Sequence, residues 1–493
     1  MRSVWLMFGL AASVGVLCAV AFSVHTGPAA GRGRGGFAPL HGVEEPVGLV
    51  AIGGGATPES TEVSLEQDLA LVRQVFDTDV RVLFGGGPGA RTVRLTDPSI
   101  DGNDLLVRLG DLFAPRAGRR SRYRASRLPM AGPASLAEVE RHLKRALKSG
   151  SEPLYVYIAT HGEQGDERSE NWAVLWGGEA LTVGRVAHLH DRASRPMVAI
   201  VTSCYSGGFA ELAFRGGDPK QGPTQTTRCG LFSGPWDRPT SGCDPDPDRR
   251  KQDSYSVHML NALNGLDRDG ESPLASHLDA DGDGRVSLLE AHTRARIRSV
   301  SIDVPTTTSE RFLRAVQASG ADSPADFLPE ERAVVEQLGE LLGVRDATEA
   351  GKRNAVLRAE LEAVDAALAS SERSYDEHYR SLAARLLAAY PVLDDAYHPA
   401  FRPTIDAHGD AIGVLLSNSA EARAYATTQR RLEQLDRKLV ALQVREARLL
   451  RYMRAHETQR LAAALRARGG PDFAAYRRLL ACERTVPPTS KDR

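Results

Sequence analysis

The chain lacks an excess of charge of either sign. Its 493 residues include 62 lysines and arginines against 63 acids, which gives a formal net charge of −1. No overall field therefore attracts it to nucleic acid or to an anionic surface. Five arginines gather between Arg116 and Arg124, but Tyr123 is the only aromatic residue among them. Because a nucleic-acid site would interleave stacking residues, we expect no nucleic-acid partner and a solvated basic loop over 112–134.

Charge is absent altogether from residues 3–24, and Arg2 is the only charged residue before them. Residues 1–30 are typical of a targeting segment, and two alternatives stay open. One is a cleaved signal peptide, and the other is an uncleaved anchor in which 3–24 tethers the protein to a membrane. Residues 31–45 follow as a glycine- and arginine-rich linker. The sequence predicts an extracytoplasmic protein, secreted or periplasmic.

Cysteine is scarce, with five residues in the chain. Cys18 lies in the targeting segment, and Cys482 has no evident partner. Cys229 and Cys243 lie in loop-like sequence rich in glycine, proline, aspartate and threonine. In an oxidising compartment these two either form a disulfide or remain two unpaired thiols.

Two short apolar runs each end in a chemically active residue. Residues 154–160 end at His161, and residues 197–203 end at Cys204. Both runs are typical of buried strands in a parallel sheet. Ligands bind beyond the carboxyl ends of such strands, so the imidazole and the thiol are predicted to meet at one crevice. Together they form a cysteine nucleophile and its proton-handling partner.

At these residues the sequence resembles the caspases, metacaspases and legumains. Thr160-His161-Gly162 is similar to their His-Gly motif, and 202–207 (Thr-Ser-Cys-Tyr-Ser-Gly) resembles the acidic-Ala-Cys-Glu-Ser-Gly of legumain. The resemblance implies the caspase–haemoglobinase fold over residues 46–300: a mostly parallel α/β sheet flanked by helices. It also implies a polypeptide substrate, with Cys204 attacking the scissile carbonyl, His161 protonating the leaving amine, and the backbone N–H groups of Gly162 and Cys204 stabilising the oxyanion.

One position departs from these families. Metacaspases and legumains carry an acid two residues before the cysteine, where this chain has Thr202. Their preference for a substrate side chain is therefore not carried over. The acids near enough in sequence to substitute are Glu163, Asp166 and Glu211.

Residues 279–290 fill the EF-hand calcium template. Acids stand at loop positions 1, 3 and 5, glycine at 6, a polar residue at 9 and glutamate at 12. This spacing wraps a hard cation in oxygens, with the last glutamate reaching back as a bidentate ligand. The sequence predicts one Ca²⁺ held by Asp279, Asp281, Asp283, Arg285 (through its carbonyl), Ser287 and Glu290.

The remainder of the chain is predicted to be helical. Residues 301–349 are expected to be linker and short helices, and 350–482 carry apolar residues in alternating steps of three and four. Such heptads predict two long helices in an antiparallel hairpin, with an intermolecular coiled coil as the alternative. This region could bind a partner, self-associate or cap the crevice. Residues 483–493 are read as a tail.

Three functions follow from these patterns. The first is an exported, calcium-binding cysteine endopeptidase that uses His161 and Cys204. The second is a catalytically inactive calcium-binding scaffold that acts through its helical C-terminal region. The third is a transpeptidase on the same site, which differs only in the group that accepts the acyl chain.

Overall fold

The computed structural model describes residues 47–114, 120–317 and 324–489. The predicted targeting segment and the linker after it lie outside these residues. Within them, no helix combines the length and the apolar character that crossing a membrane requires.

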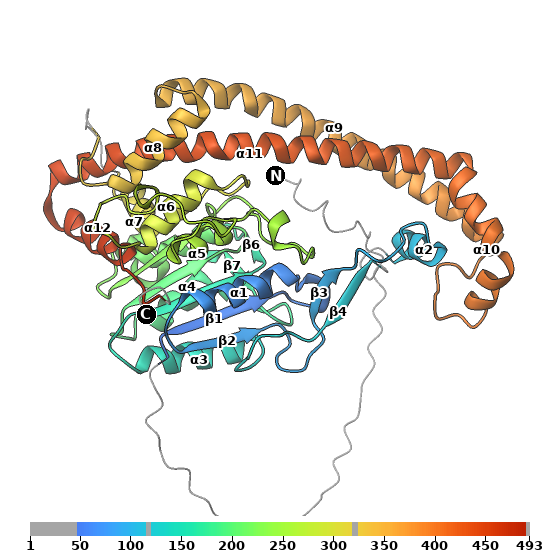
Figure 1. The fold of residues 1–493 in the computed structure, drawn as a ribbon, viewed down its shortest axis with the longest axis horizontal. Coiled ribbons are helices and arrows are strands. Elements are labelled where there is room, and N and C mark those ends of the chain that lie inside the picture. The colour runs from blue at the N-terminus through green and yellow to red at the C-terminus, as the bar shows by residue number, and fades with distance from the viewer. Residues whose placement is uncertain (1–46, 115–119, 318–323, 490–493) are drawn as a thin grey trace, which may run out of the picture.

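A six-stranded sheet forms the centre of the molecule (Figure 1). The strand order is β11-β10-β9-β5-β1-β2, and every neighbouring pair is parallel except β10 and β11. The predicted α/β fold with a mostly parallel sheet is therefore confirmed. The strands are β1 (Leu49–Gly54), β2 (Val80–Phe84), β5 (Leu154–Thr160), β9 (Met197–Val201), β10 (Arg228–Phe232) and β11 (Thr306–Thr307).

Helices cover both faces of this sheet, which explains why its central strands are continuously apolar. Tyr155 and Tyr157 of β5 join one core, whereas Val156 and Ile158 join the other, because successive side chains point to opposite faces. The first core includes residues of α1 (Val63–Val75), α5 (Tyr255–Leu263), α6 (Leu288–Arg298), α7 (Thr308–Ala315) and α12 (Gly470–Glu483). The second includes residues of α3 (Leu136–Lys148) and α4 (Val183–His190).

Two small antiparallel sheets accompany the central one. β3 (Val93–Thr96) pairs with β4 (Ser121–Arg124), and β6 (Gly162–Glu163), β7 (Trp172–Val174) and β8 (Ala180–Thr182) form the other. The expectation of a solvated loop over 112–134 is wrong at β4, because Arg124 forms a salt bridge with the buried Glu66 of α1. The helix α2 (Leu105–Phe113) lies between β3 and β4 in sequence.

The C-terminal region is a long helical arm that runs across the top of the molecule in Figure 1. Its core is the pair α9 (Ala347–Ala389) and α11 (Ala420–Arg468). Lys438 contacts Glu360 and Tyr425 contacts Tyr375, so residue numbers rise along one helix as they fall along the other. The two helices are therefore antiparallel within one chain, as the heptads predicted. α10 (Phe401–Asn418) connects them, and α8 (Pro329–Leu342) precedes them.

Arg451 of α11 fastens the arm to the sheet domain. Its guanidinium is buried and donates hydrogen bonds to four backbone carbonyls, those of Arg296, Ser299, Ser301 and Asp303. Burial lowers its pKa to about 10, still above neutrality, so the side chain carries its charge into the interior. A charged donor that satisfies four carbonyls at once fixes the segment after α6 against the arm.

The sheet domain extends further along the chain than the sequence indicated. β11 and α7 lie in the segment expected to be linker, and β11 pairs with the edge strand β10. Cys229 of β10 forms a disulfide with Cys482 of α12, so the suggested pairing of Cys229 with Cys243 is wrong. Glu483, read as the first residue of a tail, is buried and accepts hydrogen bonds at the start of α7.

Candidate functional site

His161 and Cys204 leave the same edge of the central sheet because their strands are in register. β5 and β9 are parallel neighbours in which Ile158 is paired with Val201. His161 lies three residues after Ile158, and Cys204 lies three residues after Val201. Parallel strands that leave a sheet at the same level deliver the residues that follow them to the same edge. The structure therefore brings together the two residues that the sequence analysis selected.

Gly162 makes this close approach possible. A Cβ atom on Gly162 would lie 2.0 Å from the backbone oxygen of Cys204 and 3.0 Å from the Cβ of Ser203. Any side chain would push the two strand ends apart. The reason for this glycine is therefore the neighbouring strand, whereas the sequence analysis considered only its role toward a substrate.

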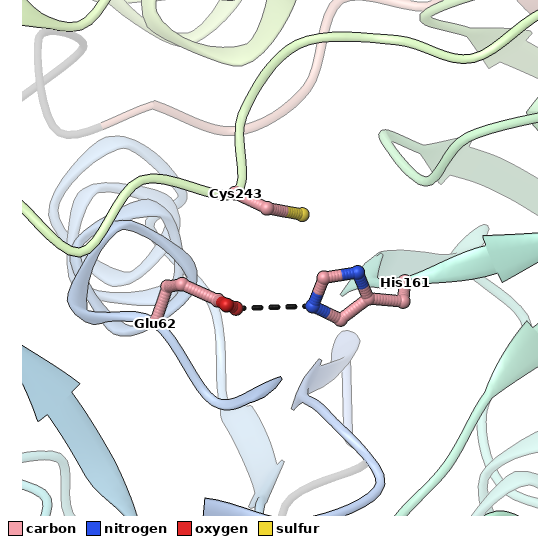
Figure 2. Close-up of side chains that lie close together, drawn as sticks. All are labelled: Glu62, His161 and Cys243. Atoms are coloured by element: carbon pink, nitrogen blue, oxygen red, sulfur yellow. Dashed lines mark hydrogen bonds and ion pairs between the residues drawn. The ribbon is translucent and has the colours of Figure 1, made fainter. Parts of the chain in front are cut away.

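Glu62 and Ser60 orient the imidazole of His161. The Nε2 atom lies 3.0 Å from the carbonyl oxygen of Ser60 and 3.0 Å from a carboxylate oxygen of Glu62. Both neighbours accept hydrogen bonds, so Nε2 carries a proton, and the ring also interacts with the Cys243 sulfur. Figure 2 shows the carboxylate and the ring facing each other. A base held by a third group is the usual arrangement around an activated nucleophile.

Glu62 is a buried, ionised carboxylate. Burial by itself would raise its pKa, but the hydrogen bond from His161 and the charges of His161 and Arg94 outweigh burial and lower it. Arg94 donates to the other carboxylate oxygen at 2.9 Å. Cys243 and then Glu62 raise the pKa of His161 well above its usual value through their charges and hydrogen bonds, despite desolvation. The imidazolium form is accordingly favoured.

Cys204 lies under the loop that follows β10, over residues 233–243. The backbone N–H of Thr240 donates to the Cys204 sulfur at 3.3 Å, and the thiol donates to the Thr240 carbonyl at 3.5 Å. Burial and then the charge of Cys243 raise the pKa of Cys204 to about 11. In this closed arrangement Cys204 is a thiol and not a thiolate at neutral pH.

A strained turn follows Cys204. Tyr205 has φ = 58° and ψ = 17°, in the left-handed region that non-glycine residues seldom adopt. Its N–H donates to the carbonyl of Arg238 in the covering loop, and its carbonyl accepts from Asn171. Backbone strain of this kind persists where the surroundings enforce it, and it clusters at functional sites.

A second free thiol, Cys243, reaches the same site. Its sulfur, a nitrogen of His161 and a carboxylate oxygen of Glu62 all lie within 4.8 Å of one another. Sequence reasoning missed Cys243 as a site residue because it considered this cysteine only as a disulfide partner or as an unpaired loop thiol without a role. It missed Glu62 because nothing in the local sequence distinguishes this glutamate from any other acid before a helix.

The acids suggested as replacements for the acidic residue of metacaspases and legumains take different positions, and Asp166 is exposed. Thr202 donates to the carbonyl of Ile158 within the sheet, and Glu211 is buried in a salt bridge with Arg311. Glu163 is partly buried, and desolvation raises its pKa. The geometry therefore assigns no side-chain preference to the site.

The loop over 279–290 leads into α6, and its last residues form the first turn of that helix. The carboxylate oxygens of Asp279, Asp281 and Asp283 lie within 4.8 Å of one another. Glu290 folds back onto the loop, where it accepts from the N–H of Ala280 at 2.7 Å, and Ser287 caps α6. Gly284 has φ = 83°, the conformation that the sharp turn of a calcium loop requires. The oxygen donors fit a hard cation.

No protein-family model matches this chain, and no curated protein sequence matches it either.

Proposed function

We propose that the protein is an exported cysteine endopeptidase in which Cys204 is the nucleophile and His161 is the general acid and base. The observation that carries this proposal is the register of β5 and β9, which ends both strands at one point beside an imidazole oriented by Glu62. An imidazole–carboxylate pair next to a strand-end thiol is more specialised than a buried structural cysteine requires.

The chemistry proceeds in two balanced steps. The Cys204 thiolate adds to the scissile carbonyl, and the C–N bond breaks as the His161 imidazolium gives its proton to the leaving amine. This leaves a thioester and a neutral imidazole. Water then attacks the thioester, gives a proton to His161, and releases the carboxylic acid and the thiolate. The backbone N–H groups of Gly162 and Cys204 are the donors proposed for the oxyanion.

Catalysis on this scheme requires the covering loop to move. Thr240 is hydrogen-bonded to the Cys204 sulfur in the closed arrangement, and desolvation raises the pKa of this partly buried thiol to about 11. Substrate binding would displace Thr240 and bring the sulfur next to the His161 imidazolium, which favours the thiolate. The closed arrangement then represents the resting form of the enzyme.

A peptide carrying a thiol-reactive group tests the proposal. With calcium present, we expect covalent labelling that peptide mapping assigns to Cys204. Cys204→Ala and His161→Ala should both abolish labelling, and Cys204→Ala retains Cys243 as an internal control for a non-specific thiol. Labelling of folded Cys204→Ala at Cys243, or no labelling of the folded wild type, would refute the assignment of the nucleophile.

We also propose that the loop 279–290 binds one Ca²⁺ through the three aspartates, the Arg285 carbonyl, Ser287 and Glu290. The convergence of the aspartate oxygens and the return of Glu290 to the loop support this. The ion would brace the N-terminus of α6, whose C-terminal end leads to the carbonyls that hold Arg451. Its role on this view is structural.

One observation favours a second candidate, a non-catalytic calcium-binding scaffold. Cys204 is protonated and its sulfur is hydrogen-bonded to Thr240, as expected of an inert structural thiol. This candidate predicts no turnover of any member of a positional-scanning peptide library, with or without calcium. Turnover that depends on Cys204 would exclude it.

A further inference from the structure

Three side chains from separate parts of the chain converge on one point. Glu62 is the N-cap residue of α1, His161 follows β5, and Cys243 belongs to the loop between β10 and α5. One oxygen, one nitrogen and one sulfur from these residues all lie within 4.8 Å of one another. Figure 2 shows the Cys243 sulfur directed toward the space beside the carboxylate and the imidazole. The peptidase steps proposed above make no use of Cys243.

We propose that Glu62, His161 and Cys243 form a binding site for one Zn²⁺ ion. A thiolate, an imidazole and a carboxylate are the three kinds of ligand that zinc takes in proteins. Calcium and magnesium require oxygen ligands throughout, so this donor set separates the site from the aspartate loop. Three protein ligands leave one coordination position open.

The distances need little adjustment. Zinc bonds of about 2.0–2.3 Å in a tetrahedron separate the ligand atoms by roughly 3.3–3.8 Å. The carboxylate oxygen of Glu62 is 3.0 Å from Nε2 of His161, so an ion that replaces the shared proton moves these two atoms apart by only a few tenths of an ångström. The sulfur of Cys243 closes in from within 4.8 Å.

The surroundings hold the carboxylate ready for such an ion. Arg94 donates to the Glu62 oxygen that faces away from His161, at 2.9 Å. The backbone of Arg94 also donates to the carbonyl of Thr61 at 2.8 Å, which fixes the segment that carries Glu62. Outer partners that orient a ligand in this way raise metal affinity.

Metal binding has a direct consequence for the covering loop. Cys243 ends the segment in which Thr240 contacts the Cys204 sulfur and Arg238 accepts from Tyr205. An ion that joins Cys243 to His161 fastens this loop over Cys204, and an ion on Nε2 prevents His161 from forming the imidazolium that protonates the leaving amine. Zinc therefore acts as an inhibitor of the peptidase. This inhibition rests on the proposed peptidase function, whereas the binding of zinc does not.

Cobalt titration tests the site independently of activity. The full-length protein is stripped of metal, saturated with Ca²⁺ to fill the aspartate loop, and titrated with Co²⁺ as a spectroscopic substitute for zinc. We expect one Co²⁺ per chain, a thiolate-to-cobalt charge-transfer band, and displacement of the cobalt by Zn²⁺. Cys243→Ser should abolish the band and weaken Co²⁺ binding about tenfold or more, whereas the matched variant Cys204→Ser should keep both.

Two results would overturn the site: a band that survives in Cys243→Ser, or no cobalt uptake at millimolar Co²⁺. Circular dichroism establishes that each variant is folded, and Cys243→Ala repeats the test without introducing a hydroxyl group. Cys243 lies in a loop outside the sheet but packs against the core that includes α1, so both folding controls are needed.

Probe labelling separates the site from the peptidase proposal. One equivalent of Zn²⁺ should slow labelling of wild-type Cys204, and a chelator followed by fresh Ca²⁺ should restore it. The same amount of Zn²⁺ should not change the rate at which Cys204 is labelled in Cys243→Ser. If zinc slowed labelling of this variant as much as it slows the wild type, the inhibitory role would be wrong. Cobalt binding as expected without any labelling would refute the peptidase and leave the metal site standing. Normal labelling without any cobalt binding would refute the metal site and leave the peptidase proposal standing.

Discussion

Replacing Arg451 with methionine should destabilise the protein by about 3–5 kcal/mol. The guanidinium donates to four backbone carbonyls in the interior, at 2.7, 3.2, 2.8 and 2.9 Å. Each such hydrogen bond contributes about 1 kcal/mol net, and carbonyls left without a donor add a desolvation penalty. Removing the charge from a buried site recovers part of this loss. The estimate agrees with the 3–5 kcal/mol typical of breaking one side of a buried charged contact.

Methionine retains the packing of the side-chain stem, so the loss reports the hydrogen bonds. The assay is urea denaturation followed by far-UV circular dichroism, with Arg445→Met as the matched control. Arg445 lies on the same helix but is exposed, and its replacement should change stability by no more than about 0.5 kcal/mol. An Arg451→Met protein within about 1 kcal/mol of the wild type would mean that water replaces the guanidinium, and the reasoning would be wrong.

The same variant should also loosen the covering loop. The carboxylate of Asp303 accepts from the N–H of Ser241 at 2.6 Å, and the carbonyl of Asp303 accepts from Arg451. Losing Arg451 removes one of the contacts that hold Asp303 and should thereby loosen the loop over Cys204. Alkylation of Cys204 by a small thiol reagent should therefore be faster in Arg451→Met than in Arg445→Met. Equal rates in the two folded variants would argue against this connection.

Three further predictions concern single carboxylates. Glu62→Gln should lower kcat/KM of the proposed peptidase about 10²-fold, because Ser60 still orients the ring. The alkaline limb of its pH profile of kcat/KM should also move to lower pH. Cys243 and Glu62 both raise the pKa of His161 in the wild type, and only Cys243 does so in the variant. An alkaline limb at the wild-type pH would contradict this. Glu290→Gln should retain the cap of α6 but weaken Ca²⁺ binding about tenfold or more, measured by the calcium dependence of Tm; unchanged dependence would exclude Glu290 as a ligand. Burial raises the pKa of Glu483 from 4.5 in the unfolded chain to about 7 in the folded protein. The free energy of unfolding of the wild type should therefore fall by on the order of 3 kcal/mol as the pH rises through this interval. Glu483→Gln should gain stability relative to wild type between pH 5 and pH 8, and a constant difference in urea denaturation would contradict the shift.

The sequence was sufficient for features that depend on local pattern. β5 and β9 were predicted because runs of apolar and β-branched residues indicate buried strands, and their order placed His161 beside Cys204. The heptads predicted α9 and α11 for the same reason, since packing along a helix repeats at short intervals.

Long-range contacts account for what the sequence did not predict. Glu62 meets His161 across 99 positions, and Cys229 pairs with Cys482 across 253. No local pattern selects among several acids or five cysteines for such a contact, because the choice depends on how the elements pack. β11 was missed because it has only two residues and pairs at an edge, below the length at which alternation can be recognised.

The bond between Cys229 and Cys482 has a topological consequence. It joins a strand of the central sheet to the last helix, so a single cut anywhere from residue 230 to residue 481 yields two polypeptides that remain one molecule. A protease that cuts the chain between the sheet domain and the helical arm therefore does not release the arm. The two fragments would separate on a denaturing gel only after reduction of the disulfide. Whether they can dissociate therefore depends on the redox state of the surroundings.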